Sequence, residues 1–156
     1  MRPWKRLVAL VLTVGAGAGA ITAFAVAPAI AGSTSSTPTI KLISTNKGKL
    51  LSVKGFVVYR FSRDGNGNKN TCVKVKNCPM TWPALTTVGK PQAGPGVKAS
   101  LLGTTKLPNG KHQVTYAGHP IYNYAFNYGK GSTLYIGVHE FGGQWDGVTA
   151  SGKAVK

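Results

Sequence analysis

Acidic side chains are scarce in this chain of 156 residues: three Asp and Glu stand against 19 Lys and Arg, a formal net charge of +16. So few carboxylates leave little material for the paired acids of general acid–base catalysis. The scarcity of carboxylates also argues against a calcium site at Asp64-Gly-Asn66-Gly-Asn68. In addition, Lys69 and Val75 stand where a calcium loop has its glycine and its closing glutamate.

Recognised catalytic and metal-binding motifs are missing as well. There is no Gly-x-Ser-x-Gly nucleophile turn and no His-Glu-x-x-His pair. His112, His119 and His139 share no recognised ligand spacing and have no cysteine near them in sequence, although their convergence in space stays open. The sequence therefore predicts no catalytic residue, no metal and no cofactor, and a protein that is not an enzyme.

Cysteine is limited to Cys72 and Cys78. In an exported protein such a pair predicts a disulfide. A redox role is the weaker alternative, because there is no Cys-x-x-Cys motif. Gly32 stands directly after Ala31, where a lipid anchor would need a cysteine, so a lipid anchor at that point is not available.

The start of the chain predicts an export signal. Residues 1–31 combine a basic start, a long uncharged apolar stretch and the small residues Ala29-Ile30-Ala31, a pattern typical of a cleaved secretory signal. An uncleaved membrane anchor is the alternative, since the stretch is long enough to span a bilayer. We expect cleavage, a flexible lead-in over residues 32–38, and a secreted protein that is free or retained at the cell envelope.

Removal of residues 1–31 would leave 16 basic and three acidic side chains, a net charge of +13. Such an imbalance attracts polyanions without sequence specificity. The expected partners are anionic cell-wall polymers or a membrane surface, with no specific nucleic acid; oligomeric state is not predicted. The lysines are scattered singly, so the alternative is that the charge serves only solubility.

The sequence also indicates an internal repeat. A constant offset of 63 positions superimposes Asn46 on Asn109, Gly55 on Gly118, Tyr59 on Tyr122 and Trp82 on Trp145. This predicts one β domain over residues 39–156, made of repeats at 39–88 and 97–153. The segment Gly89–Gly96 between them is too rich in glycine and proline for regular structure.

Each repeat predicts the same hairpin. Two-residue turns at Lys54-Gly55 and Ala117-Gly118 follow β-prone segments, and aromatic and β-branched residues return from each turn. No long period of 3.6 is present, so we expect a compact all-β domain of two related antiparallel units. The remaining expectations are leading strands at Ile40–Ile43 and Val97–Leu102 and at most a short helical turn in Cys78–Leu85.

The returning strand reads Tyr59-Arg-Phe61-Ser-Arg-Asp64 and is followed by Cys72, Cys78 and Trp82-Pro83. This resembles a bacterial family of secreted tandem repeats, often predicted lipoproteins, with a Tyr-x-aromatic-x-x-Asp motif and a molecular function recorded as unknown. Further landmarks are similar to that family, in Val97–Gly103, Phe141–Trp145 and Ser151–Val155. The chain differs in lacking the lipoprotein cysteine, in its cysteine spacing, and in Tyr122-Asn-Tyr124-Ala-Phe-Asn127, which lacks the acid.

The motif has two interpretations. Residues two apart in a strand face one side, so Tyr59 with Phe61, and Tyr122 with Tyr124, would pack together while Asp64 accepts hydrogen bonds from turn amides. Asn127 would cap the second copy, and Trp82 and Trp145 would be core landmarks. Alternatively, these motif residues bind a small ligand, metal or redox partner. The candidate binding residues are Tyr59, Phe61, Asp64, Tyr122, Tyr124 and Asn127.

Overall fold

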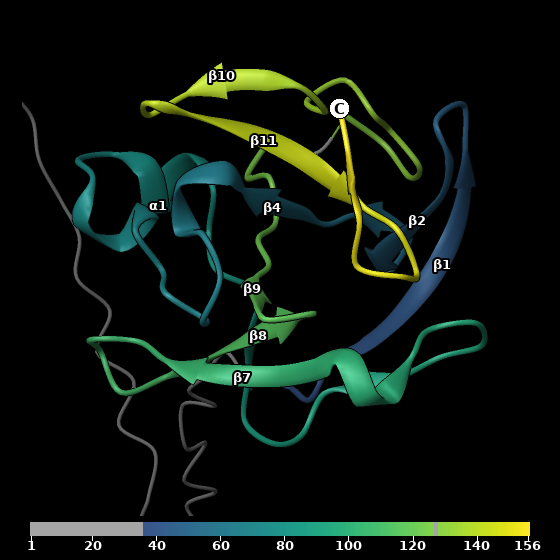
Figure 1. Ribbon diagram of the computed structural model, residues 1–156, viewed down its shortest axis with the longest axis horizontal. Coiled ribbons are helices and arrows are strands. Elements are labelled where there is room, and N and C mark those ends of the chain that lie inside the picture. Colours follow the sequence, from purple (N-terminus) through teal and green to yellow (C-terminus); the bar gives the residue numbers. More distant parts are fainter. Residues whose placement is uncertain (1–35, 127) are drawn as a thin grey trace, which may run out of the picture. The chain divides into compact units, whose positions relative to one another are not determined.

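A computed structural model of the protein describes residues 36–126 and 128–156, shown in colour in Figure 1. The predicted signal, the first part of the lead-in and Asn127 lie outside the described residues. The described part is built of β-strands with one short α-helix, which confirms the all-β class. The disulfide between Cys72 and Cys78 is formed, also as predicted.

The elements follow one another closely along the chain. The strands are β1 (Thr39–Thr45), β2 (Gly48–Val53), β3 (Phe56–Val57), β4 (Tyr59–Phe61), β5 (Thr86–Thr87), β6 (Gln92–Ala93), β7 (Leu102–Lys106), β8 (His112–Tyr116), β9 (His119–Pro120), β10 (Val138–Glu140), β11 (Gly143–Val148) and β12 (Ala154–Val155). The helices are η1 (Ser62–Asp64), η2 (Cys72–Lys74), α1 (Cys78–Thr81) and η3 (Ala99–Leu101), of which α1 confirms the expected helical turn.

The strands form three small sheets. The first has the order β3-β2-β1-β6, the second β10-β11-β12 with β4 also on β11, and the third β5-β8-β7 with β9 also on β8. Figure 1 shows the second sheet, with β10 and β11, and the third, with β7 and β8, on opposite sides of the domain, while β1 runs along one flank. Most pairings are antiparallel; β1 with β6 is parallel.

The two predicted hairpins have the same geometry. Ser52 pairs with Val57 in the first and Thr115 with Pro120 in the second, so the register agrees at the offset of 63. Both residues of each turn have positive φ, 53° and 88° at Lys54-Gly55 and 49° and 77° at Ala117-Gly118. These are the angles of a type I′ turn, which matches the right-handed twist of paired strands.

Segments of the two predicted repeats also pair with each other. Tyr59 pairs with Gly147 and Tyr122 with Ala84, and these two partners are again 63 positions apart. Tyr59 and Tyr122 bridge each other, each N–H donating to the other's carbonyl at 2.9 and 2.8 Å. The matched pairing agrees with an internal duplication, which stays a prediction.

Two local expectations are wrong. The leading strand expected at Val97–Leu102 begins only at Leu102, because η3 occupies Ala99–Leu101. The breaker-rich segment Gly89–Gly96 contains β6, whose residues pair with Thr39 and Ile40. A long-range partner therefore imposes a strand on a sequence that would not form one locally.

Two hydrophobic clusters fill the interior. The aliphatic cluster contains Ile40, Leu51, Val58, Leu85, Val114, Tyr116, Ile121 and Val148. The aromatic cluster contains Leu50, Val57, Tyr59, Phe61, Cys72, Cys78, Trp82, Tyr122, Tyr124, Ile136 and Trp145. Both clusters and the disulfide lie within residues 36–156, so this part has its own complete core. No helix among the described residues is long and apolar enough to cross a membrane.

Candidate functional site: the aromatic cluster, an adjoining cleft and a cationic surface

The motif aromatics are brought together in the aromatic cluster. Tyr59, Phe61, Tyr122 and Tyr124 are all buried, which agrees with the packing interpretation. Tyr59 and Phe61 face the same side of β4, as strand geometry requires. Their buried rings are not available to a large ligand from solution.

The rings form a continuous stack through the domain. Trp145 stacks between Phe61 and Trp82, with ring centroids 4.2 and 4.0 Å apart. Tyr124 packs on Trp82 with ring centroids 4.8 Å apart and stacks on Tyr135 at 3.7 Å. Contacts at these distances stabilise a core beyond the area that the rings bury. Trp82 and Trp145, equivalent under the offset of 63, are therefore direct partners at the centre of the core.

Asp64 fastens the loop that follows η1. Its Oδ1 accepts hydrogen bonds from the backbone N–H and the hydroxyl of Thr71, both at 2.8 Å, and its Oδ2 accepts one from the Tyr122 hydroxyl at 2.6 Å. This carboxylate does accept a backbone amide, but the donor is Thr71, seven positions on, and not one of the turn amides directly after Asp64 that were expected. Tyr122 was not anticipated as a partner, and it ties the first half to the second.

Burial controls the ionisation of this pair. Burial raises the pKa of Asp64, and the hydrogen bonds from Tyr122 and Thr71 only partly oppose it. Burial, followed by the charge of Asp64, raises the pKa of the Tyr122 hydroxyl. Burial also raises the pKa of Tyr59 to about 12. Neither phenol is therefore prepared to act as a base near neutral pH.

The disulfide segment closes one side of the aromatic cluster. Cys72 and Cys78 are both buried beside Trp82. The indole Nε1–H of Trp82 donates to Oε2 of Glu140 at 2.9 Å, across 58 positions of sequence. The cysteine–tryptophan segment is thus part of the core itself.

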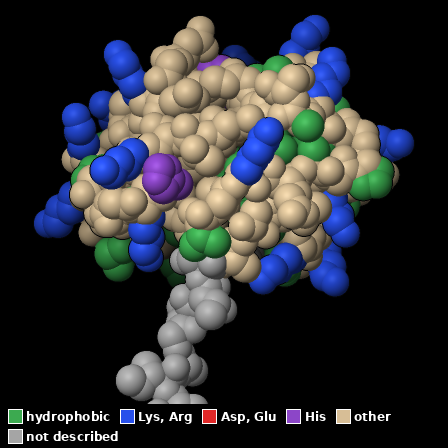
Figure 2. Space-filling model, turned by 90° about the horizontal axis from the view of Figure 1, so that it is seen from below, with side chains coloured by type: hydrophobic (Ala, Val, Ile, Leu, Met, Phe, Trp, Pro, Cys, Tyr) green, Lys and Arg blue, Asp and Glu red, His purple; other side chains and the backbone are tan. Residues whose placement is uncertain are grey.

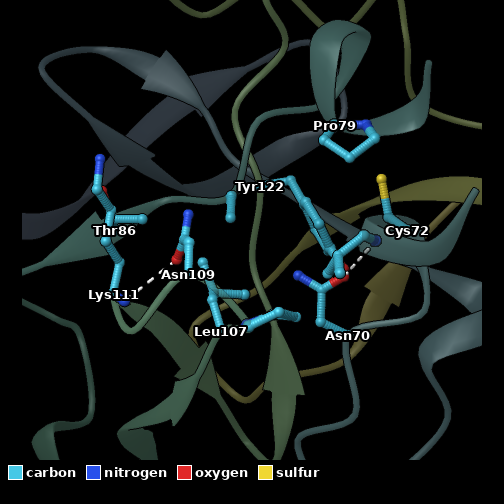
Figure 3. Close-up of a pocket in the computed structure, with 11 residues that line it drawn as sticks. Asn70, Cys72, Pro79, Thr86, Leu107, Asn109, Lys111 and Tyr122 are labelled. Carbon is cyan, nitrogen blue, oxygen red and sulfur yellow. Dashed lines mark hydrogen bonds between the residues drawn. The ribbon is translucent and has the colours of Figure 1, made fainter. Parts of the chain in front are cut away.

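A cleft of about 400 Å³ lies between the disulfide segment and the β7–β8 loop (Figure 3). Tyr122 lies in the middle of this view, with Cys72 and Pro79 on one side and Leu107 and Asn109 toward the other. Most of the lining is apolar, and Asn70, Asn109 and Lys111 add polar groups. Sequence reasoning missed this cleft, because its walls come from segments about thirty positions apart. A small ligand with an apolar body would fit such a site.

The surface carries charge of one sign. Asp64 and Asp146 are only 2% and 3% exposed, and Glu140 is half-buried against Trp82. Every lysine from Lys41 to Lys156 is exposed, and so is Arg63. Figure 2 shows lysine and arginine side chains around the whole outline of one face, with no acidic side chain on it.

A wide polar groove of about 810 Å³ gathers three of these lysines, Lys41, Lys54 and Lys130. Its floor is formed in part by Ala84, Leu85 and Thr86. Lysine charges along a concave wall strengthen the local positive potential. Such a groove can hold an extended anionic chain.

A second group of polar side chains lies near β4 and β11. Arg60 is opposite Asp146 in the register of β4 with β11. Burial raises the pKa of Asp146 against the opposing charges of Arg60, Lys156 and His139. Burial lowers the pKa of His119, and the charge of Arg60 adds to that effect. Within the described residues, no three His, Cys, Asp or Glu side chains are grouped so as to hold a metal ion.

Comparison with known proteins adds no family to this description. No family model, no curated protein and no solved structure matches the chain.

Proposed function

We propose that this chain is a secreted, non-catalytic protein that associates with anionic material of the cell envelope, either cell-wall polymers or the membrane surface, through its cationic surface. The observation that carries the proposal is the separation of charge: the acids face inward or bind a core indole, while the lysines face solvent. A surface with many exposed lysines and few accessible carboxylates attracts polyanions.

The secretory signal over residues 1–31 and the duplicated Tyr-x-aromatic motif belong to the same proposal. A buried disulfide supports export, because such bonds persist in oxidising compartments. The matched hairpin registers support a two-copy repeat like that of the secreted family which the sequence resembles. The ring stack and the tethered Asp64 support a structural role for the motif.

Salt dependence tests the proposal on the producing cells. Washing with 0.5 M salt is expected to release most of the retained protein, since charges are screened beyond about 4–5 Å at that concentration. Binding of purified residues 32–156 to a poly(glycerol phosphate) polymer is expected to weaken in the same range. Retention that survives the salt wash, or no retention at low salt, would contradict a charge-driven association.

A second candidate function is binding of a small ligand in the cleft beside Tyr122. The cleft volume of about 400 Å³ favours it, as does the motif tyrosine in its lining. Native mass spectrometry of the protein from its own host tests this candidate directly. A bound mass, lost when Val73→Trp fills the cleft, would support it, because Val73 lines the cleft and not the groove; the apo mass alone would count against it.

A further inference from the structure

Large apolar side chains are exposed in one short segment. Phe126, Tyr128 and Leu134, here called the apolar patch, are 60%, 63% and 70% exposed. Only Met80 and Val88 among the other described residues are large hydrophobic side chains with comparable exposure. Phe126 and Tyr128 both contact Tyr124, and Leu134 directly precedes Tyr135, which stacks on Tyr124 and Tyr128. Exposed apolar side chains gathered around one pair of rings are typical of a surface that meets an apolar partner.

The patch is attached to the buried ring stack. Phe126 packs on Tyr124 with ring centroids 5.6 Å apart, and Tyr128 stacks on Tyr135 at 5.7 Å. Tyr124 and Tyr135 are themselves stacked, and Tyr124 contacts the buried Trp82. The exposed rings are therefore held in place by the core, which lowers the entropy lost when they bind.

Lysines surround this segment. Lys130 belongs to it, and the Lys130 methylenes lie against Gly55, next to Lys54. The Gly131 N–H donates to the Gly55 carbonyl at 2.9 Å, which keeps the two lysines close. On another side, the Thr133 hydroxyl donates to Asn46 Oδ1 at 2.8 Å, beside Lys47.

We infer that the apolar patch is a docking surface that inserts into the interface of an anionic lipid bilayer while Lys47, Lys54 and Lys130 contact the head groups. The inference rests on the proposed function and names its partner as lipid. Aromatic and aliphatic side chains beside lysines are the combination that binds an anionic membrane interface. A glycan would use the ring faces but would gain little from Leu134, which offers it neither a stacking face nor a hydrogen bond.

A tryptophan reporter tests the insertion. Trp82 and Trp145 are fully buried, so Phe126→Trp or Leu134→Trp in residues 32–156 adds one exposed indole. With vesicles of 30% phosphatidylglycerol in phosphatidylcholine, its emission is expected to shift to the blue and to be quenched by lipids brominated in the acyl chain. Val88→Trp, at a site 67% exposed outside the patch, is the matched control and is expected to show neither effect.

Serine variants separate this inference from the proposed function. Phe126→Ser with Leu134→Ser is expected to weaken partitioning into the anionic vesicles at least about tenfold. The same variant should bind poly(glycerol phosphate) as the unmodified protein does, because its charge is unchanged. If the tryptophan variants bind vesicles without an emission shift, insertion is overturned but charge-driven association stands. If the unmodified protein binds neither the anionic vesicles nor poly(glycerol phosphate), the proposed function is overturned. If the serine variant binds uncharged glycan strands more weakly than the unmodified protein but binds vesicles equally well, the apolar patch is a sugar-binding surface and the inference is overturned.

Discussion

The halves 39–88 and 97–153 reach the same core by different backbones. Their hairpins agree in register and in turn angles, but the segments that precede the equivalent tryptophans differ. Trp82 follows α1, whose first residue Cys78 forms the disulfide with Cys72, whereas Trp145 lies on β11, paired with β10. The indoles are nevertheless parallel, 4° apart in plane, at the centre of the aromatic cluster. Both halves therefore contribute a tryptophan to the same ring packing, but each holds its tryptophan with a different secondary structure.

Removing either indole is expected to have the largest effect. Trp82→Ala and Trp145→Ala each leave a large cavity in a fully buried stack, and each should lower the free energy of unfolding by about 3–5 kcal/mol. Urea denaturation followed by circular dichroism measures the loss. A cost below about 1 kcal/mol at either position would show that the stack does not hold the halves together.

Phenylalanine at the same two positions makes the comparison finer. Trp82→Phe also removes the hydrogen bond to Glu140, whereas the Trp145 Nε1–H has no partner among the described residues. Trp82→Phe should therefore cost about 1 kcal/mol more than Trp145→Phe. Equal costs in the same denaturation experiment would mean that Glu140 contributes nothing.

The next effect concerns the carboxylate that joins the halves. Asp64→Ala leaves the Thr71 N–H and the Tyr122 hydroxyl without their acceptor and should cost about 2–3 kcal/mol. Asp64→Asn copies the residue at the equivalent position of the second half and should cost less, since an amide oxygen can still accept from Thr71. Thermal unfolding of the two variants checks the order; a larger loss for Asn than for Ala would contradict this account.

The same pair predicts a dependence on pH. Because the folded-state pKa of Asp64 is raised, its protonation adds stability that is fully present below the unfolded pKa of 3.8 and is lost as pH rises through the folded value. The stability of the unmodified protein relative to Asp64→Asn should thus be greatest near pH 4 and should decline toward pH 7. A relative stability that increases over this range would contradict the direction of the shift.

The disulfide exists in one half alone, and its removal should have a moderate effect. Closing so short a loop stabilises by about 2 kcal/mol in the chain-entropy model. Cys72→Ala with Cys78→Ala should therefore lower the free energy of unfolding by about that amount, while the fold persists through the ring stack. Near-ultraviolet circular dichroism of the tryptophans tests persistence, and loss of that signal under native conditions would show that the loop is essential to the stack.

The sequence predicted the local parts of the fold and missed the parts set by distant partners. Turn chemistry at Lys54-Gly55 and Ala117-Gly118 depends on adjacent residues, so both hairpins could be recognised. β6 could not, because it becomes a strand only by pairing with β1. The start of β7 was misplaced because η3 occupies three of the six positions of Val97–Leu102, a segment in which only Val97 is β-branched.

The candidate site divides in the same way. Alternation placed Tyr59 with Phe61 and indicated their burial, and the carboxylate of Asp64 was expected to accept an amide. Its bond to Tyr122 and the cleft beside that tyrosine arise from contacts between the halves, which neither motif encodes by itself. The inward orientation of the acids was equally hidden, because composition gives the number of charges and not their burial.

The smallest expected effect lies in the two matched turns. Lys54 and Ala117 both have positive φ, a conformation that asparagine adopts at lower cost than either residue. Lys54 is exposed, so Lys54→Asn should raise the free energy of unfolding by about 0.5–1 kcal/mol. Ala117 packs against Gly152, so Ala117→Asn must crowd that contact and should lose the gain. Thermal unfolding of both variants measures the difference. Equal stabilisation would show that the two hairpins have equivalent surroundings as well as equivalent backbones. No stabilisation by Lys54→Asn would show that the positive φ of Lys54 does not destabilise the protein.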